Sequence, residues 1–274
     1  MASVPTSVPP SARRRPARRA VLALAAVALL VPLAACGDDQ EKSGAGSGAG
    51  KPPKAELTVL AAASLTDVFK TAGAAYEKAH PGTRITFSFA GSQELAAQVR
   101  QGAPADALVT ADTKTMDGLK GETGTPVVIA KNRLVIAVEE GNPRRVDTLE
   151  DLADPGLKVV LAAPEVPVGR YSRKILDAQD ITVKPVSLEP NVRAVLTKVE
   201  LGEADAGLVY RTDAATAPDE VDAVEIPDDR NAVAQYPAAT LKTTDNEAAA
   251  KAFVDWLAGP EARKILLDAG FQRP

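Results

Sequence analysis

The sequence contains one cysteine, Cys36, and one histidine, His80, among 274 residues. A protein with a single cysteine has no internal disulfide, so its fold must depend on the hydrophobic core. Without a second histidine or a free thiol, neither a Ser-His-Asp triad nor a zinc site of His and Cys ligands can be assembled. His80 precedes Pro81 at the predicted end of a helix, where a histidine more often caps the helix than acts as a base. We therefore expect no enzymatic activity.

Basic residues are scarce beyond the first 35 positions, which carry five arginines and no acidic residue. Residues 36–274 hold 27 Lys and Arg against 36 Asp and Glu, a net charge of −9. A surface of this sign argues against nucleic acid as a partner and repels anions at long range. Any anion site must therefore bind through short-range dipoles. The adjacent acidic pairs Asp38-Asp39 and Asp228-Asp229 lie in loop-like surroundings with diverging side chains, so they indicate solvated surface.

Residues 1–35 are typical of a secretory signal peptide. Five arginines precede an apolar stretch from Ala20 to Ala35, which is too short and too interrupted by Pro32 for a transmembrane helix. The stretch ends in Leu33-Ala34-Ala35-Cys36, which resembles the bacterial lipobox, whose cysteine is lipidated and becomes the first mature residue. The alternative is a buried free cysteine after an ordinary signal. The resemblance implies an extracytoplasmic protein that is anchored to the cell membrane by a lipid on Cys36.

Residues 36–54 are rich in Gly, Ser and charged residues and include a Lys-Pro-Pro segment. The run from Gly44 to Gly50 could be mistaken for a phosphate-binding loop, but no strand precedes it and no helix follows it. We therefore predict a flexible tether between the membrane and a folded domain of residues 55–274.

Short apolar runs alternate with helical segments from residue 55 to the C-terminus. Strands are predicted at residues 56–61, 84–90, 107–110, 132–139, 158–162, 206–210, 221–226 and 235–241. Helices are predicted at residues 64–80, 93–101, 149–153, 169–177, 192–201 and 247–267. This alternation implies βαβ units and an α/β fold with mixed, mostly parallel sheets. We predict two lobes, with lobe one formed by residues 55–133 and 236–274 and lobe two by residues 134–235.

Two of the predicted strand-to-helix turns carry a serine. Ser64 lies in Ala61-Ala62-Ala63-Ser64-Leu65-Thr66-Asp67, and Ser92 lies in Phe89-Ala90-Gly91-Ser92-Gln93. Each turn directs backbone N–H groups and a hydroxyl to the crevice beyond the carboxyl ends of the strands, where ligands bind in such folds. The alternative is that each serine only caps its own helix, as in a capping box. The two roles are compatible, because a capping serine at a crevice can also donate to an anion.

Seven segments between Leu57 and the C-terminus, in the same order, resemble the molybdate-binding proteins of ABC importers, which belong to the periplasmic-binding-protein superfamily. The matching segments are Ala61-Ala62-Ala63-Ser64-Leu65-Thr66, Ser88-Phe89-Ala90-Gly91-Ser92, Gln101-Gly102-Ala103-Pro104-Ala105-Asp106, Asn132-Arg133-Leu134-Val135, Val166-Pro167-Val168-Gly169-Arg170-Tyr171, Asn191-Val192-Arg193-Ala194 and Gly207-Leu208-Val209-Tyr210. The resemblance implies a two-lobed fold of the type 2 class with a ligand cleft at its hinge.

In that family, two serine hydroxyls, one tyrosine hydroxyl and backbone amides hold the oxyanion. By position, the resemblance implies these ligand-binding residues: the hydroxyls of Ser64 and Ser92 from lobe one, and the amides of Val168 and Val192 with the hydroxyl of Tyr210 from lobe two. The family usually has Ala at the position of Val168. Read without the resemblance, Tyr210 is a strand-end aromatic that packs on the core. Because the family site is built from neutral donors, we expect Arg170 at the cleft rim or in a structural ion pair.

The resemblance implies a solute-binding protein that captures molybdate, and also tungstate, and delivers it to an ABC permease. It implies a monomer without a cofactor, with molybdenum contacted only through its oxygens. The nearest alternative is the same architecture binding another oxyanion, such as sulfate or thiosulfate. A lipid-anchored hydrolase is a remote alternative, and the lack of a usable His or Cys argues against it. The effector domain of a transcription regulator can share this fold, but the secretion signal and the absence of a helix-turn-helix segment argue against that function.

Overall fold

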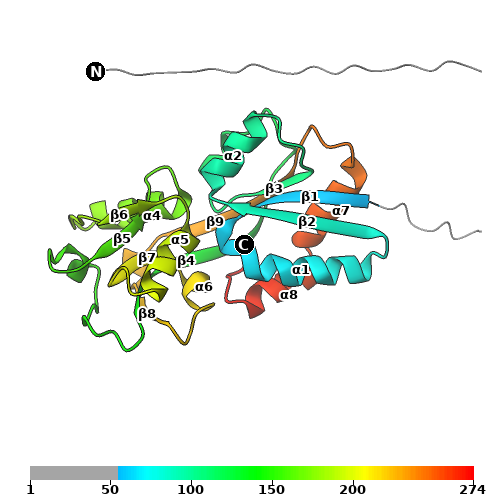
Figure 1. Cartoon of the computed structure of the whole chain (residues 1–274). Helices are drawn as coiled ribbons and strands as arrows, with labels where there is room; N and C mark the ends of the chain where they lie inside the picture. The colour runs from blue at the N-terminus through cyan, green and yellow to red at the C-terminus, as the bar shows by residue number, and fades with distance from the viewer. Residues whose placement is uncertain (1–54) are drawn as a thin grey trace, which may run out of the picture. The chain divides into compact units, whose positions relative to one another are not determined.

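A nine-stranded sheet is the framework of residues 55–274, the part of the chain that the computed structural model describes (Figure 1). The strands are β1 (Ala55–Ala62), β2 (Thr83–Ala90), β3 (Ala107–Val109), β4 (Val127–Glu139), β5 (Val159–Ala162), β6 (Ser187–Glu189), β7 (Ala206–Tyr210), β8 (Val221–Glu225) and β9 (Val233–Thr240). Their order in the sheet is β2-β1-β3-β9-β4-β7-β5-β6, and β8 pairs with β4 outside this path. The predicted signal peptide, Cys36 and the tether lie outside the described residues.

The sheet is mixed, with parallel strands at its two ends and antiparallel strands between them. β1 pairs in parallel with β2 and β3, and β5 pairs in parallel with β6 and β7. β9 runs antiparallel to β3 and β4, and β4 runs antiparallel to β7 and β8. The α/β class and the mixed sheet are as predicted. The βα alternation implied more parallel pairing than is found, because it carries no information about the long-range partners of β4 and β9.

The long strand β4 changes partners part-way along its length. Its residues 127–133 pair with β9, whereas residues 134–139 pair with β7 and β8. Each half of β4 therefore has neighbouring strands, and most of its side chains are buried. β4 therefore joins one group of strands (β1, β2, β3) to the other (β5, β6, β7, β8), and the change falls between Arg133 and Leu134.

Helices cover both groups of strands. They are α1 (Thr66–Ala79), α2 (Ser92–Arg100), α3 (Thr113–Asp117), α4 (Pro167–Asp177), α5 (Val192–Glu200), α6 (Arg211–Ala214), α7 (Glu247–Leu257) and α8 (Pro260–Asp268), with 3-10 turns η1 (Ala63–Leu65), η2 (Glu150–Ala153) and η3 (Asp228–Arg230). α1, α7 and α8 pack beside β1, β2 and β9, whereas α4 and α5 pack on β5 and β7 (Figure 1). The chain thus returns from the second group of strands to the first through β9.

The predicted C-terminal helix is two helices, which is a correction. α7 ends before Gly259, and Pro260 is the first residue of α8. Proline has no N–H and its ring clashes with the preceding turn, so a helix ends before it, whereas its fixed φ suits the first position of the next helix. None of the helices between residues 55 and 274 has the length and apolar character that a membrane crossing requires.

The C-terminus of α1 has the histidine cap that its sequence predicts. His80 is the C-cap residue, and its ring Nδ1 donates to the carbonyl oxygen of Tyr76 at 2.9 Å. The two rings are stacked with centroids 3.9 Å apart. Tyr76 also contacts Phe253 and Trp256 of α7 edge-on, so this end of α1 is held by aromatic packing.

Candidate functional site

A small cavity lies where the carboxyl ends of the parallel strands from both groups meet. Its free volume is about 10 Å³, room for little more than one water-sized sphere. The lining residues are Ala62, Ala63, Ser64, Ala90, Gly91, Ser92, Ala111, Val166, Pro167, Val168, Asn191, Val192 and Tyr210. Each follows or ends a parallel strand or begins a helix, which is where ligands bind in α/β sheets. A cavity of this size has no room for a large organic ligand.

All five residues that the sequence predicts for the site line this cavity, and they come from five different elements. They are Ser64 in η1 after β1, Ser92 at the start of α2, Val168 at the start of α4, Val192 at the start of α5 and Tyr210 at the end of β7. The first two belong to one group of strands and helices and the other three to the second group. The cavity therefore lies between the two groups.

Neither serine caps its helix, so the capping interpretation is wrong. Leu65 is the N-cap of α1 and Gly91 is the N-cap of α2, and neither N-cap residue makes a side-chain hydrogen bond. Ser64 instead lies within the 3-10 turn η1, which ends at Leu65, directly before α1 begins. Both serine side chains are buried, and their hydroxyls are free of the capping role.

Each serine hydroxyl is held from behind by another group. Ser64 Oγ lies 3.0 Å from the hydroxyl of Tyr236 on β9. Ser92 Oγ accepts a hydrogen bond from the N–H of Ala111 at 3.0 Å. A hydroxyl that accepts in this way keeps its own proton for another partner. Ser92 can therefore donate to a ligand in the cavity without losing the contact that positions it.

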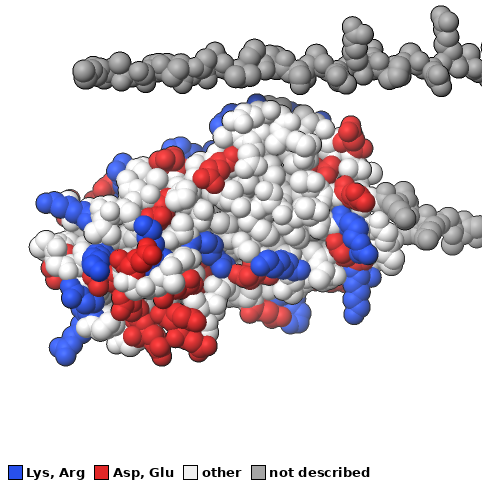
Figure 2. All heavy atoms as spheres, in the orientation of Figure 1, with Lys and Arg blue, Asp and Glu red and all other residues white. Residues whose placement is uncertain are grey.

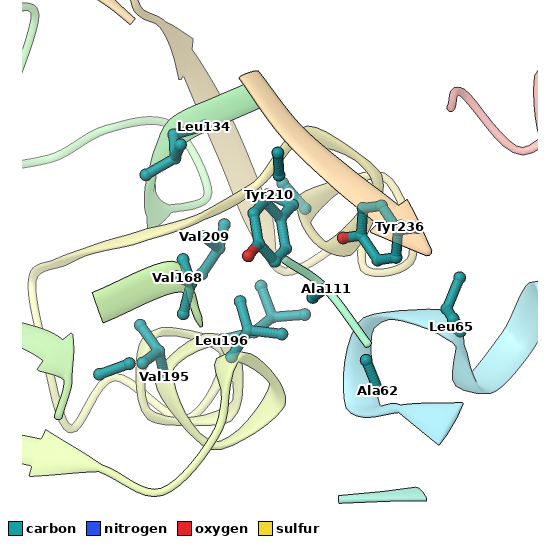
Figure 3. Close-up of a cluster of buried hydrophobic side chains, with 14 of the residues drawn as sticks. Ala62, Leu65, Ala111, Leu134, Val168, Val195, Leu196, Val209, Tyr210 and Tyr236 are labelled. Atoms are coloured by element: carbon teal, nitrogen blue, oxygen red, sulfur yellow. The ribbon is translucent and has the colours of Figure 1, made fainter. Parts of the chain in front are cut away.

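Tyr210 has a buried hydroxyl with no hydrogen-bond partner among the described residues. Burial raises the pKa of this phenol well above its usual value, so the hydroxyl stays protonated and can only act as a neutral donor or acceptor. Its ring contacts that of Tyr236 edge-on, and in Figure 3 its oxygen points to the side on which Val168 lies. An unpartnered buried hydroxyl costs about 1–3 kcal/mol, which a ligand acceptor in the cavity would offset.

The backbone of Tyr210 is fixed by a buried ion pair. Asp213 Oδ2 accepts from the Tyr210 N–H at 3.3 Å, and Asp213 Oδ1 accepts from Arg193 Nε at 2.7 Å. Burial raises the pKa of Asp213 to about 6, and Arg193 opposes that rise. Arg193 also reaches Asp67 on α1 at 2.8 Å. This arginine, which the sequence did not single out, thus joins the Tyr210 segment to the first helix.

Two helix N-termini face the cavity and offer backbone donors. Val168 and Val192 lie in the first turns of α4 and α5, where N–H groups have no acceptor within the helix. Asn191 caps α5 by accepting from the Ala194 N–H at 3.0 Å, which leaves the Val192 N–H without that acceptor. A Cβ atom at Gly169 would lie 2.1 Å from the carbonyl oxygen of Ala163, so only glycine lets the first turn of α4, which carries Val168, lie this close to the end of β5.

No charged residue lines the cavity among residues 55–274. Arg170 instead pairs with Asp112, to which its Nε donates at 3.0 Å, and its Nη2 donates to Thr115 Oγ1 at 2.8 Å. The prediction of a structural ion pair for Arg170 is therefore confirmed. No group of three or more His, Cys, Asp or Glu in the described part of the chain could hold a metal ion. The cavity therefore offers hydroxyl and amide donors to a small anion. It offers no carboxylate to a cation.

Two residues behind the cavity were missed from the sequence, Tyr236 and Asn132. Both lie in apolar strands, where their pattern predicts core packing and gives no sign of a site. The sequence offered only a side chain with a polar group within each predicted strand.

Comparisons with known proteins show the family of the chain. The family described as bacterial extracellular solute-binding protein matches residues 57–272. The chain belongs to this family. It is a solute-binding protein and not an enzyme.

Individual relatives cover nearly the whole chain. The molybdate-binding protein ModA of Mycobacterium tuberculosis is 41% identical over 255 residues, which are 92% of this chain and 97% of that protein. The putative ABC transporter substrate-binding lipoprotein YvgL of Bacillus subtilis is 30% identical over 90% of this chain and 96% of that protein. The structure of the Azotobacter vinelandii periplasmic molybdate-binding protein superposes with a TM-score of 0.67 at 24% identity, over 80% of this chain and 99% of that one. The two proteins share one fold.

Proposed function

We propose that the protein captures molybdate outside the cytoplasm and delivers it to an ABC permease. The observation that carries this proposal is the cavity itself, in which three hydroxyls and two helix N-termini converge with no charged side chain. The relatives that are named as molybdate-binding proteins support it. A tetrahedral dianion presents four acceptor oxygens, so it matches a cavity of donors. Tungstate has the same charge and shape and is expected to bind as well.

The two groups of strands are proposed to act as lobes that close on the ligand, with residues 55–133 and 236–274 in one lobe and 134–235 in the other. Contacts between them support this division. Gln93 Nε2 at the start of α2 donates to the carbonyl oxygen of Pro190 at 2.7 Å, and Arg193 of α5 pairs with Asp67 of α1. Closing would remove water from the ligand and present a distinct surface to the permease.

Gly91 offers a test of closure, because a Cβ atom there would lie 2.5 Å both from the carbonyl oxygen of Pro190 and from Gln93 Nε2, the two atoms that are hydrogen-bonded between the groups. Its φ of −60° suits any residue, so Gly91→Ala should leave the fold of α2 intact and push the second lobe away. Such overpacking costs ~1–3 kcal/mol, and we expect about a tenfold weaker affinity for molybdate in calorimetric titration.

The matched control is Gly121→Ala, because nothing lies within 4 Å of the Cβ position at Gly121. It should bind molybdate as the wild type does. Wild-type protein that binds no molybdate would overturn the proposed function. Equal affinities of wild type and Gly91→Ala would overturn only the closure of the two lobes.

The protein is further proposed to be held at the cell membrane by a lipid on Cys36, as a monomer. The Leu-Ala-Ala-Cys segment supports the anchor, as does the similarity to a relative named as a lipoprotein. We expect the wild type to partition with membranes and to incorporate labelled fatty acid, and Cys36→Ala to do neither. Freely secreted, unlabelled wild-type protein would contradict the anchor.

The charge distribution fits a small-molecule partner better than a nucleic acid. On the face drawn in Figure 2, basic and acidic side chains are interspersed, and acidic side chains gather over β8. Asp222 and Glu225 of β8 are among the exposed acids. A nucleic-acid-binding face would carry a basic patch or stripe, which this face does not show.

A further inference from the structure

A chain of four buried polar side chains leads from the cavity wall into the interior. Ser64 Oγ lies 3.0 Å from Tyr236 Oη, and Asn132 Nδ2 lies 3.5 Å from the same Tyr236 oxygen. Asn132 Nδ2 also donates to Thr212 Oγ1 at 2.8 Å. All four side chains are buried, with exposed fractions of 4% or less. The chain joins β4, β9 and α6 behind the ligand cavity.

The orientation of the Asn132 amide follows from its other contact. The N–H of Arg133 donates to Asn132 Oδ1 at 2.9 Å, so the oxygen of the amide must be on that side. The nitrogen therefore faces Tyr236 and Thr212. An amide nitrogen donates two hydrogen bonds and accepts none.

A donor at Asn132 gives the whole chain one direction. If Tyr236 Oη accepts from Asn132, at 3.5 Å, its single proton is directed at Ser64 Oγ, which lies 3.0 Å away. Ser64 Oγ then accepts from Tyr236, and its own proton is left for the cavity. If Ser64 instead donated to Tyr236, the Tyr236 proton would have to point away from Ser64, toward the amide protons of Asn132.

We infer that Asn132 and Tyr236 are positioning residues that hold Ser64 as a hydrogen-bond donor and so make the cavity reject oxyanions that carry a proton. Ser92 is held as a donor in the same way by the Ala111 N–H, at 3.0 Å. The Tyr210 hydroxyl is unpartnered within the described residues. Hydrogen phosphate brings an O–H group, for which neither serine offers an acceptor, and the Tyr210 hydroxyl could accept it only by turning its own proton away from the ligand. The inference rests on the proposed function and adds to it the residues that set its selectivity.

The purely structural alternative makes a different prediction. If the hydrogen-bonded chain only satisfies buried polar groups, its loss lowers the stability of the fold and weakens the binding of every oxyanion by the same factor. If it sets the direction of Ser64, its loss changes the ratio between proton-bearing and proton-free oxyanions. The ratio of the affinities for molybdate and for hydrogen phosphate therefore distinguishes the two alternatives.

Asn132→Asp and Tyr236→Phe test the direction of the chain. Asp has the shape of Asn but only accepts, so Tyr236 would donate to it and Ser64 would turn to donate to Tyr236, leaving a lone pair toward the cavity. Tyr236→Phe keeps the ring that packs on Tyr210 and Phe271 and frees the Ser64 hydroxyl to accept. Competition titrations of the purified protein would use molybdate, sulfate and phosphate above the second pKa of phosphate, where all three are dianions.

In both variants we expect the preference for molybdate over hydrogen phosphate to fall about tenfold, while the preference for molybdate over sulfate is unchanged. Because the three ligands have equal charge, the negative charge of Asp cancels in these ratios. Unchanged ratios in folded Tyr236→Phe protein would overturn the inference. Wild-type protein that binds no molybdate would instead overturn the proposed function on which it rests.

Discussion

Ser92→Ala and Ser64→Ala are each expected to lower the affinity for molybdate by roughly ten- to a hundredfold. A hydrogen bond to a charged group contributes about 1.5–3 kcal/mol, and about 1.4 kcal/mol corresponds to a tenfold change in affinity. Both hydroxyls line the cavity, and both are positioned by a contact on the side away from it. Calorimetric titration of each variant with molybdate measures the loss.

Tyr210→Phe separates binding from stability more cleanly than either serine variant. Ser92→Ala leaves the Ala111 N–H without its acceptor, so part of its effect falls on the fold. The Tyr210 hydroxyl has no partner among the described residues, so its removal leaves nothing unpaired and keeps the ring packing. We expect a lower affinity with an unchanged or higher free energy of unfolding.

The control for these variants is Thr123→Val, which removes another buried hydroxyl. Thr123 Oγ1 donates to the carbonyl oxygen of Leu119 at 2.9 Å, and neither residue lines the cavity. This variant should lose some stability and no affinity. Serine and tyrosine variants that bind molybdate as the wild type does would place the ligand elsewhere.

Most strands and long helices could be predicted from the sequence, because their apolar spacing is local. β1, β2 and β7 and the helices α1, α2, α4 and α5 lie within a few residues of their predicted ranges. The short elements β6, α3 and α6 were not predicted, since three to five residues carry too little periodicity. The antiparallel joining of β4 to β9 was not predicted either, because pairing over a hundred residues leaves no local pattern.

The candidate site was predicted through the resemblance rather than through the residues alone. Tyr210 looks like a strand-end aromatic, and it does pack against Tyr236, but its hydroxyl lies unpartnered at the cavity. The serines look like helix caps, yet Leu65 and Gly91 occupy the N-cap positions. A sequence pattern cannot distinguish a hydroxyl that caps a helix from one that lies a residue away and faces a cavity.

The residues that orient the site could not be predicted because their roles depend on contacts between distant segments. Asn132 meets Thr212 across 80 residues of sequence, and Ser64 meets Tyr236 across 172. Asn132 lies in β4, Tyr236 in β9 and Thr212 in α6, and the local sequence of these elements gives no sign of a shared hydrogen-bonded chain. Only the three-dimensional arrangement shows that they form one hydrogen-bonded chain.

Selectivity among oxyanions follows from what the cavity lacks. No carboxylate of residues 55–274 lines it, so the proton of hydrogen phosphate would be left unpaired at a cost of about 1–3 kcal/mol and would also face other donors. Sulfate carries no proton, and only its size distinguishes it from molybdate. Its shorter bonds to oxygen would leave donors from the two lobes unable to reach it together, and close-packed walls cannot shrink around it.

Competition titration with molybdate, tungstate, sulfate and phosphate is the most direct test of a donor-only oxyanion cavity. We expect molybdate and tungstate to bind within about tenfold of each other, and sulfate and phosphate to bind at least about a hundredfold more weakly. Sulfate or phosphate that binds as tightly as molybdate would contradict the proposed function and leave the fold unaffected.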